Sequence, residues 1–226
     1  NEVTKAYENG ELTIEEIDEK VEKILSLKEE SYELLEKYFY GKEFDEVKEY
    51  IDNDEHKALA SKIVDDSLTL VKGKNIYLNK KTLVITTEPF ATTIAEDELN
   101  VRSIASVIKE AKLDCDVEKI KVSIEDEEIE RLYIKAKSYE QVLVCTYNAN
   151  LFTKQADLIN KLDIIGNDLF VLATRSPYDI YRFSQIKNYL CLYEYTPNSV
   201  LTVCKYLQGK ITPTAKLPVD LKKKLM

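Results

Sequence analysis

The chain has 226 residues, of which 44% are hydrophobic and 32% charged, and its formal net charge is -9. That length holds one large domain, or one domain with an appendage. The acidic balance disfavours nucleic acid as a partner, because binding to phosphates needs clustered Lys and Arg. No apolar run approaches the roughly 18 residues of a membrane span, and the opening residues lack the basic and apolar regions of a signal peptide.

The amino-terminal part is predicted to be helical and charged. A helix should begin at Thr13, because Glu16 stands three residues later, as in a capping box. Further helical stretches are predicted over residues 31–40, ended by Gly41, and over residues 43–51. In the first helix, apolar residues at helical spacing form one stripe that needs a partner: Ile14, Ile17, Val21, Ile24 and Leu25.

From residue 55 on, predicted strands alternate with predicted helices, which is typical of a mostly parallel sheet. We therefore expect an α/β fold, a three-layer α/β/α sandwich preceded by a helical appendage. The charged strand near residue 120 is expected at an edge of the sheet. The predicted strands cover residues 67–71, 82–87, 117–122, 141–146, 169–174 and 189–195, and the helices 56–66, 100–111, 124–137, 152–162, 181–185 and 197–206.

The most informative stretch is the uncharged run 169–174 with the polar residues behind it. Such a run predicts a strand buried on both faces. Arg175, Tyr178 and Asp179 follow it at the carboxyl end, where open α/β sheets place their ligands and interfaces. Pro177 stops the strand and holds the residue before it extended, so this loop is stiff. Tyr147 and Asn148 follow the 141–146 strand and are expected at the same edge.

Two interpretations of this loop stay open. In the structural one, Asp179 caps the next helix and Arg175 pairs locally, so Asp179→Ala costs about 1 kcal/mol of stability. In the functional one, the loops at Tyr147, Asn148, Arg175, Tyr178 and Asp179 lie at a domain interface or at the edge of a cleft.

Several kinds of chemistry are disfavoured. The chain has five glycines, and none forms a phosphate-binding pattern after a strand, so we expect no nucleotide or other cofactor. A Ser-His-Asp hydrolase needs a G-x-S-x-G turn and a late histidine, whereas His56 is early and alone. The four cysteines form no C-x-x-C pair, so no metal site is predicted. They are expected to be buried, and unpaired thiols favour a cytoplasmic over an exported or cell-envelope protein: Cys115, Cys145, Cys191 and Cys204.

Four segments, in this order, resemble glycoside hydrolase family 3. Residues 10–13 with 17–18 and 24–28 are similar to the last helix of that family's barrel. His56-x-x-Leu59-Ala60 and residues 67–72 are similar to the entry of its second domain, and residues 207–219 to its closing turn and strand, with Ala215 where the family usually has Gly. The run 175–179 resembles a signature of the β-N-acetylglucosaminidase (β-hexosaminidase) branch.

The resemblance implies a division of labour. In this branch the nucleophilic Asp and the Asp-His acid/base pair lie on loops of an amino-terminal (β/α)8 barrel, which would precede Asn1. Residues 1–54 would be the last barrel helix and a connector, and residues 55–226 the carboxyl-terminal domain. This implies an accessory domain without catalytic residues, whose partner is the barrel and which meets carbohydrate only within the longer enzyme. The alternative is a stand-alone α/β module that binds a ligand or partner without catalysis.

Overall fold

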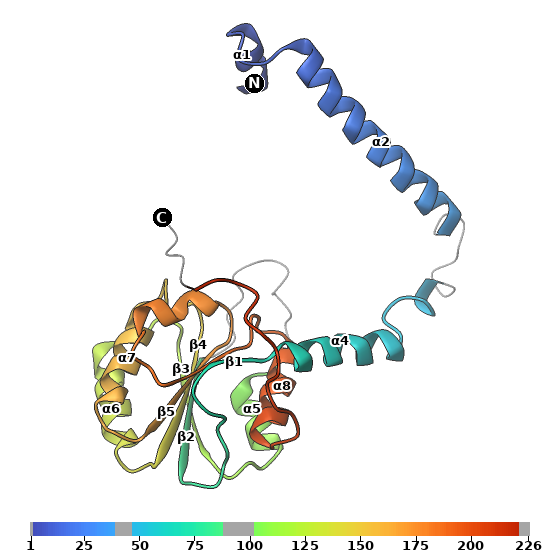
Figure 1. Ribbon diagram of the computed structural model, residues 1–226. Helices are drawn as coiled ribbons and strands as arrows, with labels where there is room; N and C mark the ends of the chain where they lie inside the picture. Colours follow the sequence, from blue (N-terminus) through green and yellow to red (C-terminus); the bar gives the residue numbers. More distant parts are fainter. Residues whose placement is uncertain (1, 39–46, 88–101, 222–226) are drawn as a thin grey trace. The chain divides into compact units, whose positions relative to one another are not determined.

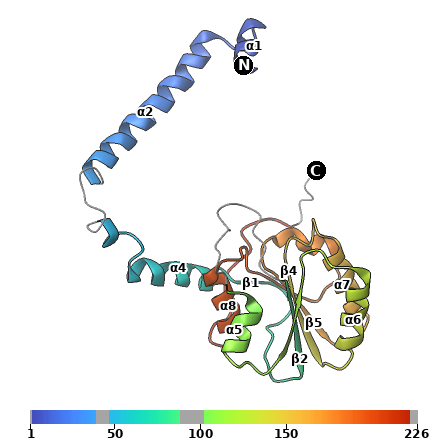
Figure 2. The ribbon, with the colours of Figure 1, turned by 180° about the vertical axis from the view of Figure 1, so that it is seen from behind.

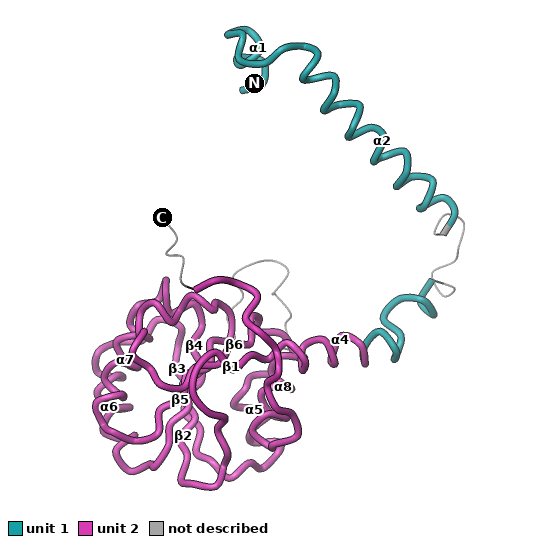
Figure 3. The backbone as a smooth tube through the Cα atoms, viewed as in Figure 1, with its two compact units in different colours: residues 1–57 teal, residues 58–226 magenta. Residues whose placement is uncertain are grey.

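The computed structural model describes residues 2–38, 47–87 and 102–221, and the chain divides into two compact units, residues 1–57 and 58–226 (Figure 3). The first unit contains α1 (Glu2–Glu8) and α2 (Ile14–Tyr38). The predicted capping box is confirmed, since the Glu16 N–H donates to Thr13 Oγ1 over 3.2 Å and the Thr13 N–H to Glu16 Oε2 over 2.9 Å.

The prediction of a separate helix over residues 31–40 is wrong, because α2 runs without a break from Ile14 to Tyr38. Residues 28–31 contain no Gly or Pro to end a helix, and the Ser31 hydroxyl bonds back to the carbonyl of Leu27. The predicted stop at Gly41 and most of the 43–51 helix lie outside the described residues.

The second unit is built on a six-stranded sheet in the order β1-β6-β5-β4-β2-β3. Its strands are β1 (Thr69–Lys72), β2 (Thr82–Thr87), β3 (Asp116–Ile120), β4 (Gln141–Thr146), β5 (Asp168–Ala173) and β6 (Asn188–Cys191). The strands from β6 to β3 pair in parallel, and only β1 is antiparallel. The predicted mostly parallel sheet is confirmed, with β3 at an edge as expected.

Helices cover both faces of the sheet (Figures 1 and 2). One face carries α6 (Asp126–Ala136) and α7 (Lys154–Asp163), and the other carries α5 (Ile104–Glu110) and α8 (Pro197–Leu207). The unit also contains most of α4 (Asp54–Ser67). This arrangement confirms the three-layer sandwich. It also explains why every residue of β2 and β4 is buried, since both strands have helices above and below.

The connection from β5 to β6 differs from the prediction. Instead of a helix over residues 181–185, a 3-10 helix, η2 (Pro177–Arg182), begins at the proline. Pro177 stands at its first position, where a fixed φ and a missing N–H are best tolerated. Ser176 before it is extended, with φ -105° and ψ 120°, as a residue that precedes proline should be.

We expect the core beneath α5 and α8 to depend strongly on Phe170 in β5, whose side chain is 1% exposed. Phe170→Ala should lower the free energy of unfolding by about 3–5 kcal/mol, because it removes buried apolar surface and leaves a cavity. Ile134→Ala on α6 is the control, because Ile134 is 66% exposed and its truncation should change stability by less than about 0.5 kcal/mol. Urea unfolding measures both, and equal effects would contradict this packing.

Candidate functional site

Two loops meet at the carboxyl edge of the sheet, and we call residues 146–150 and 174–179 the carboxyl-edge corner. They follow β4 and β5, which are parallel neighbours, so both chains leave the sheet on the same side. Pairing continues one residue beyond β5, because the N–H and the hydroxyl of Thr174 both donate to the Thr146 carbonyl, over 2.9 and 2.6 Å. The two loops therefore start side by side.

An arginine and a tyrosine link the two loops. The Arg175 guanidinium carbon lies 5.7 Å from the centre of the Tyr147 ring, and Arg175 Nη1 donates to the Tyr147 hydroxyl over 3.3 Å. The Tyr147 ring is buried and packs edge-to-face on Tyr195, with 6.2 Å between ring centres. The partly exposed guanidinium is thus held against a fixed aromatic surface.

Asp179 does not cap the 3-10 helix, so this part of the structural interpretation is wrong. Ser176 is the cap, since its Oγ accepts from the Tyr178 N–H over 3.3 Å. The Asp179 carboxylate is instead fully buried and accepts from the Thr146 hydroxyl over 2.9 Å and from the Asn150 N–H over 3.1 Å. It joins η2 to both ends of the loop after β4.

Burial raises the pKa of the Asp179 carboxyl above its ordinary value, and hydrogen bonds from Ala149, Asn150 and Thr146 partly offset that rise. Asp179 is the only carboxyl group in the corner. Retaining glycoside hydrolysis needs two catalytic groups, a nucleophile and an acid/base, about 5 Å apart across the sugar. The corner alone therefore does not supply the acid/base and nucleophile of that reaction.

The other two predicted site residues are partly exposed. Asn148 has a φ of +51°, a left-handed conformation that asparagine tolerates better than most residues, and it makes the turn after β4. The Tyr178 ring stacks on Tyr181, with ring centres 6.0 Å apart and an interplanar angle of 23°. The five predicted residues thus divide into two buried supports, Tyr147 and Asp179, and three accessible groups, Asn148, Arg175 and Tyr178.

Gln155 is a further residue of the site that was not predicted from the sequence. It is buried in the first turn of α7 and hydrogen-bonds the backbone of Tyr147. A signal was present. Phe152, Ala156 and Ile159 mark the apolar face of the predicted 152–162 helix, and Gln155 falls on that face at a spacing of three to four residues. A lone amide on an apolar helix face predicts a buried group with specific hydrogen-bond partners.

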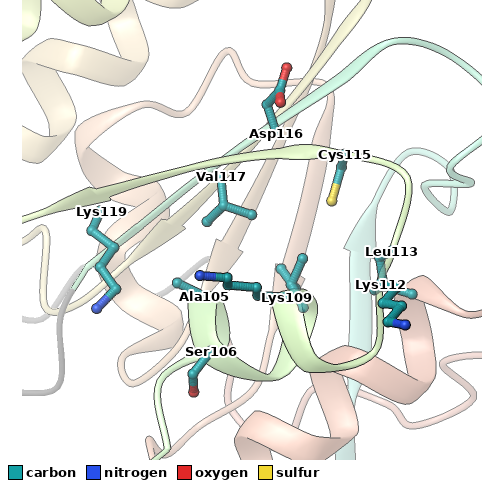
Figure 4. A pocket seen from close by; sticks show the side chains of 10 residues that line it. Ala105, Ser106, Lys109, Lys112, Leu113, Cys115, Asp116, Val117 and Lys119 are labelled. Atoms are coloured by element: carbon teal, nitrogen blue, oxygen red, sulfur yellow. The ribbon is translucent and has the colours of Figure 1, made fainter.

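A groove with a volume of about 610 Å³ lies between α5 and β3, away from the corner (Figure 4). Its lining combines apolar Ala105 and Val117 with the lysines 109, 112 and 119. Desolvation raises the pKa of the lining Cys115 thiol to about 11, so this thiol is protonated at neutral pH and a poor nucleophile. Asp116 also lines the groove, and its carboxylate accepts a hydrogen bond from the Tyr139 hydroxyl over 2.6 Å. We assign the candidate site to the carboxyl-edge corner, where the predicted site residues lie.

Within residues 2–38, 47–87 and 102–221, no group of His, Cys, Asp or Glu is placed to hold a metal ion. Over the same residues, none of the helices combines the length and the apolar character that crossing a bilayer requires. The four cysteines are free thiols, and three of them are buried.

No family model and no curated protein sequence matches this chain. Solved structures do. A glycoside hydrolase family 3 β-N-acetylglucosaminidase from Paenibacillus sp. str. FPU-7 aligns over 96% of the chain with a TM-score of 0.67 and 26% identity. A fungal multi-domain family 3 β-N-acetylglucosaminidase aligns over 97% (TM-score 0.59, 21% identity), and a β-glucosidase from Listeria innocua over 93% (TM-score 0.63, 15% identity).

The fold and these neighbours indicate a class: the chain is similar to an α/β domain of glycoside hydrolase family 3 enzymes. The chain is 26% identical to the Paenibacillus β-N-acetylglucosaminidase and 15% identical to the Listeria β-glucosidase. The likeness to the Listeria enzyme therefore shows the fold alone. The chain spans 41% of the length of the Paenibacillus protein, 25% of the fungal one and 33% of the Listeria one.

The raised pKa of Asp179 predicts a pH dependence of stability. A carboxyl whose pKa is higher in the folded than in the unfolded state stabilises the fold below its unfolded pKa, and this contribution is lost as pH rises through the folded pKa. Relative to Asp179→Asn, the free energy of unfolding of the native chain should therefore fall as pH rises from about 4 to 7. Urea unfolding over this range measures the difference.

Asp168→Asn is the matched control, with the opposite sign. Hydrogen bonds from Lys80 and Lys74 lower the pKa of the Asp168 carboxyl, so its contribution is present at neutral pH and declines as pH falls. Parallel pH profiles for the two variants would contradict the burial of an ionisable Asp179.

Proposed function

We propose that the chain is the non-catalytic carboxyl-terminal part of a family 3 β-N-acetylglucosaminidase, which packs on a (β/α)8 barrel and borders its sugar cleft. In this proposal the longer enzyme hydrolyses O-glycosidic bonds of sugars that contain N-acetylglucosamine. The branch is supported by the 26% identity to the Paenibacillus enzyme and by the run Arg175-Ser176-Pro177-Tyr178-Asp179. Residues 1–54 would then be the last barrel helix and the connector.

The observation that carries the proposal is the apolar stripe of α2. In the structure Ile14, Val21 and Ile24 are 48%, 45% and 53% exposed. No element in the described part of the first unit covers this stripe, although burying such side chains contributes about 1.5–3 kcal/mol each. A helix with this pattern is built to pack on another structure. The last helix of a barrel has this requirement.

The chemistry of the corner fits an accessory role. Arg175 and Asn148 carry hydrogen-bond donors that suit the hydroxyl and amide groups of a sugar, and Tyr178 offers an aromatic face. None of these groups is a carboxyl, and the one carboxyl of the corner, Asp179, is buried beneath them. In the proposed enzyme the corner therefore orients the sugar, while the barrel supplies the nucleophile and the acid/base group.

The alternative, a stand-alone module that binds a ligand at the carboxyl edge, explains the corner but not α2. The alignment with a family 3 β-N-acetylglucosaminidase covers 96% of the chain and therefore includes most of α2. This coverage favours the accessory domain.

We expect the chain alone not to hydrolyse an aryl N-acetylglucosaminide, whereas the longer protein that includes the barrel does. The physical reason is that a retaining mechanism needs a nucleophile and an acid/base group on either side of the sugar, whereas the corner contains one carboxyl, that of Asp179, and no histidine. Release of the aryl alcohol, followed by absorbance, measures turnover. The idea would be abandoned if the chain alone matched the rate of the longer protein.

The stripe gives a second expectation. In this chain, Ile24→Asp should leave the unfolding of the second unit unaffected, because Ile24 lies in the first unit. In the longer protein, the same substitution should lower the melting temperature. Packing the stripe on a barrel would bury an unpaired carboxylate, which is strongly unfavourable. Lys23→Asp, one position away on the same helix and outside the stripe, is the control and should be neutral in both proteins. Equal melting temperatures for the two variants of the longer protein would contradict the barrel contact.

A further inference from the structure

Gln155 makes a dense set of hydrogen bonds beneath the carboxyl-edge corner. Gln155 is 1% exposed. Its Oε1 accepts a hydrogen bond from the Tyr147 N–H over 2.9 Å. Its Nε2 donates to the Tyr147 carbonyl over 3.1 Å and to the Val122 carbonyl over 2.9 Å. One side chain therefore satisfies both backbone groups of Tyr147, as a neighbouring strand would, and ties them to the connection after β3.

The rest of the loop is held at its two ends. Asp179 accepts from the Thr146 hydroxyl and from the Asn150 N–H, and Arg182 Nη2 donates to the Asn150 carbonyl over 3.1 Å. Between these points, Tyr147 is the residue whose ring meets Arg175. Its backbone position sets where the ring lies, and the ring sets where the guanidinium rests.

We infer that Gln155 is a positioning residue of the corner: by clamping the backbone of Tyr147, it places the Arg175 guanidinium at the edge of the sugar cleft. This inference rests on the proposed function, in which Arg175 contacts the sugar. Side chains that hold a contact group in place commonly affect function without touching the ligand, since small displacements weaken binding.

A merely structural role of Gln155 is the competing explanation. A control for it lies on β4, the strand that precedes Tyr147. Gln141 lies at the other end of β4, is 3% exposed, and donates to the Tyr77 carbonyl over 2.7 Å and to the Thr82 hydroxyl over 2.6 Å. Gln141→Met removes two hydrogen bonds and Gln155→Met removes three, and each lost hydrogen bond costs about 0.5–1.5 kcal/mol. Only Gln155 is linked to the corner.

The experiment compares three variants of the longer protein with an aryl N-acetylglucosaminide as substrate. We expect Arg175→Met and Gln155→Met each to raise KM by about fivefold or more, with kcat within about twofold, because both weaken sugar binding. Gln141→Met should leave KM and kcat unchanged, although it too should lower the urea midpoint. An unchanged KM for Gln155→Met alone would overturn the inference and leave the proposed function standing. An unchanged KM for Arg175→Met would overturn the proposed sugar contact and the inference with it.

A pH profile separates positioning from general loss of stability and uses a variant of nearly the same shape. In Gln155→Glu, the carboxylate still accepts from the Tyr147 N–H but faces the carbonyls of Tyr147 and Val122 without a proton to donate. Protonation restores one donor, so the ratio of its KM to that of the native enzyme should shrink as pH falls. The ratio for Gln155→Met should not change with pH. A constant ratio for Gln155→Glu would contradict the clamp.

Discussion

Parallel pairing of β4 with β5 is the constraint on which the candidate site depends. The register joins Thr146 to Ala173, so the two chains leave the sheet together although they are 27 residues apart in sequence. Because helices cover both faces of these strands, a shift in their register would move apolar side chains from one buried layer to the other. The register is thus strongly held, and the loops that follow inherit a defined starting point.

Past the ends of the strands, backbone groups lose their ladder partners, and buried side chains replace them. Gln155 satisfies the backbone of Tyr147, and Asp179 satisfies the Asn150 N–H and the Thr146 hydroxyl. Both side chains supply hydrogen bonds to buried polar groups that would otherwise have no partner. A buried polar group without a partner costs more free energy than one exposed to water. The loops are therefore preorganised, which favours recognition of a ligand over adaptation to it.

The two units differ in how they use apolar residues. In residues 58–226 they form a layer on each side of the sheet, with fully buried strands between. In residues 1–57 the helix α2 turns a stripe of aliphatic side chains outward while its other positions are mostly charged. Aliphatic side chains at this spacing are suited to packing on another structure, and the solved structures that align with the chain are longer than it is.

What could be predicted from the sequence follows from local patterns. Uncharged runs predict β2, β4 and β5, and the helical spacing of apolar residues predicts the flanking helices and so the sandwich. Pro177 predicts the end of the strand before it. The sequence also places five candidate residues after two strands, but it does not assign their roles. Asp179 is expected as a helix cap because caps are local, whereas its partners are Thr146 and Asn150, 33 and 29 residues away. Only the tertiary structure, through the order of strands in the sheet, decides which loops meet, which carboxyl is buried and which glutamine supports the corner.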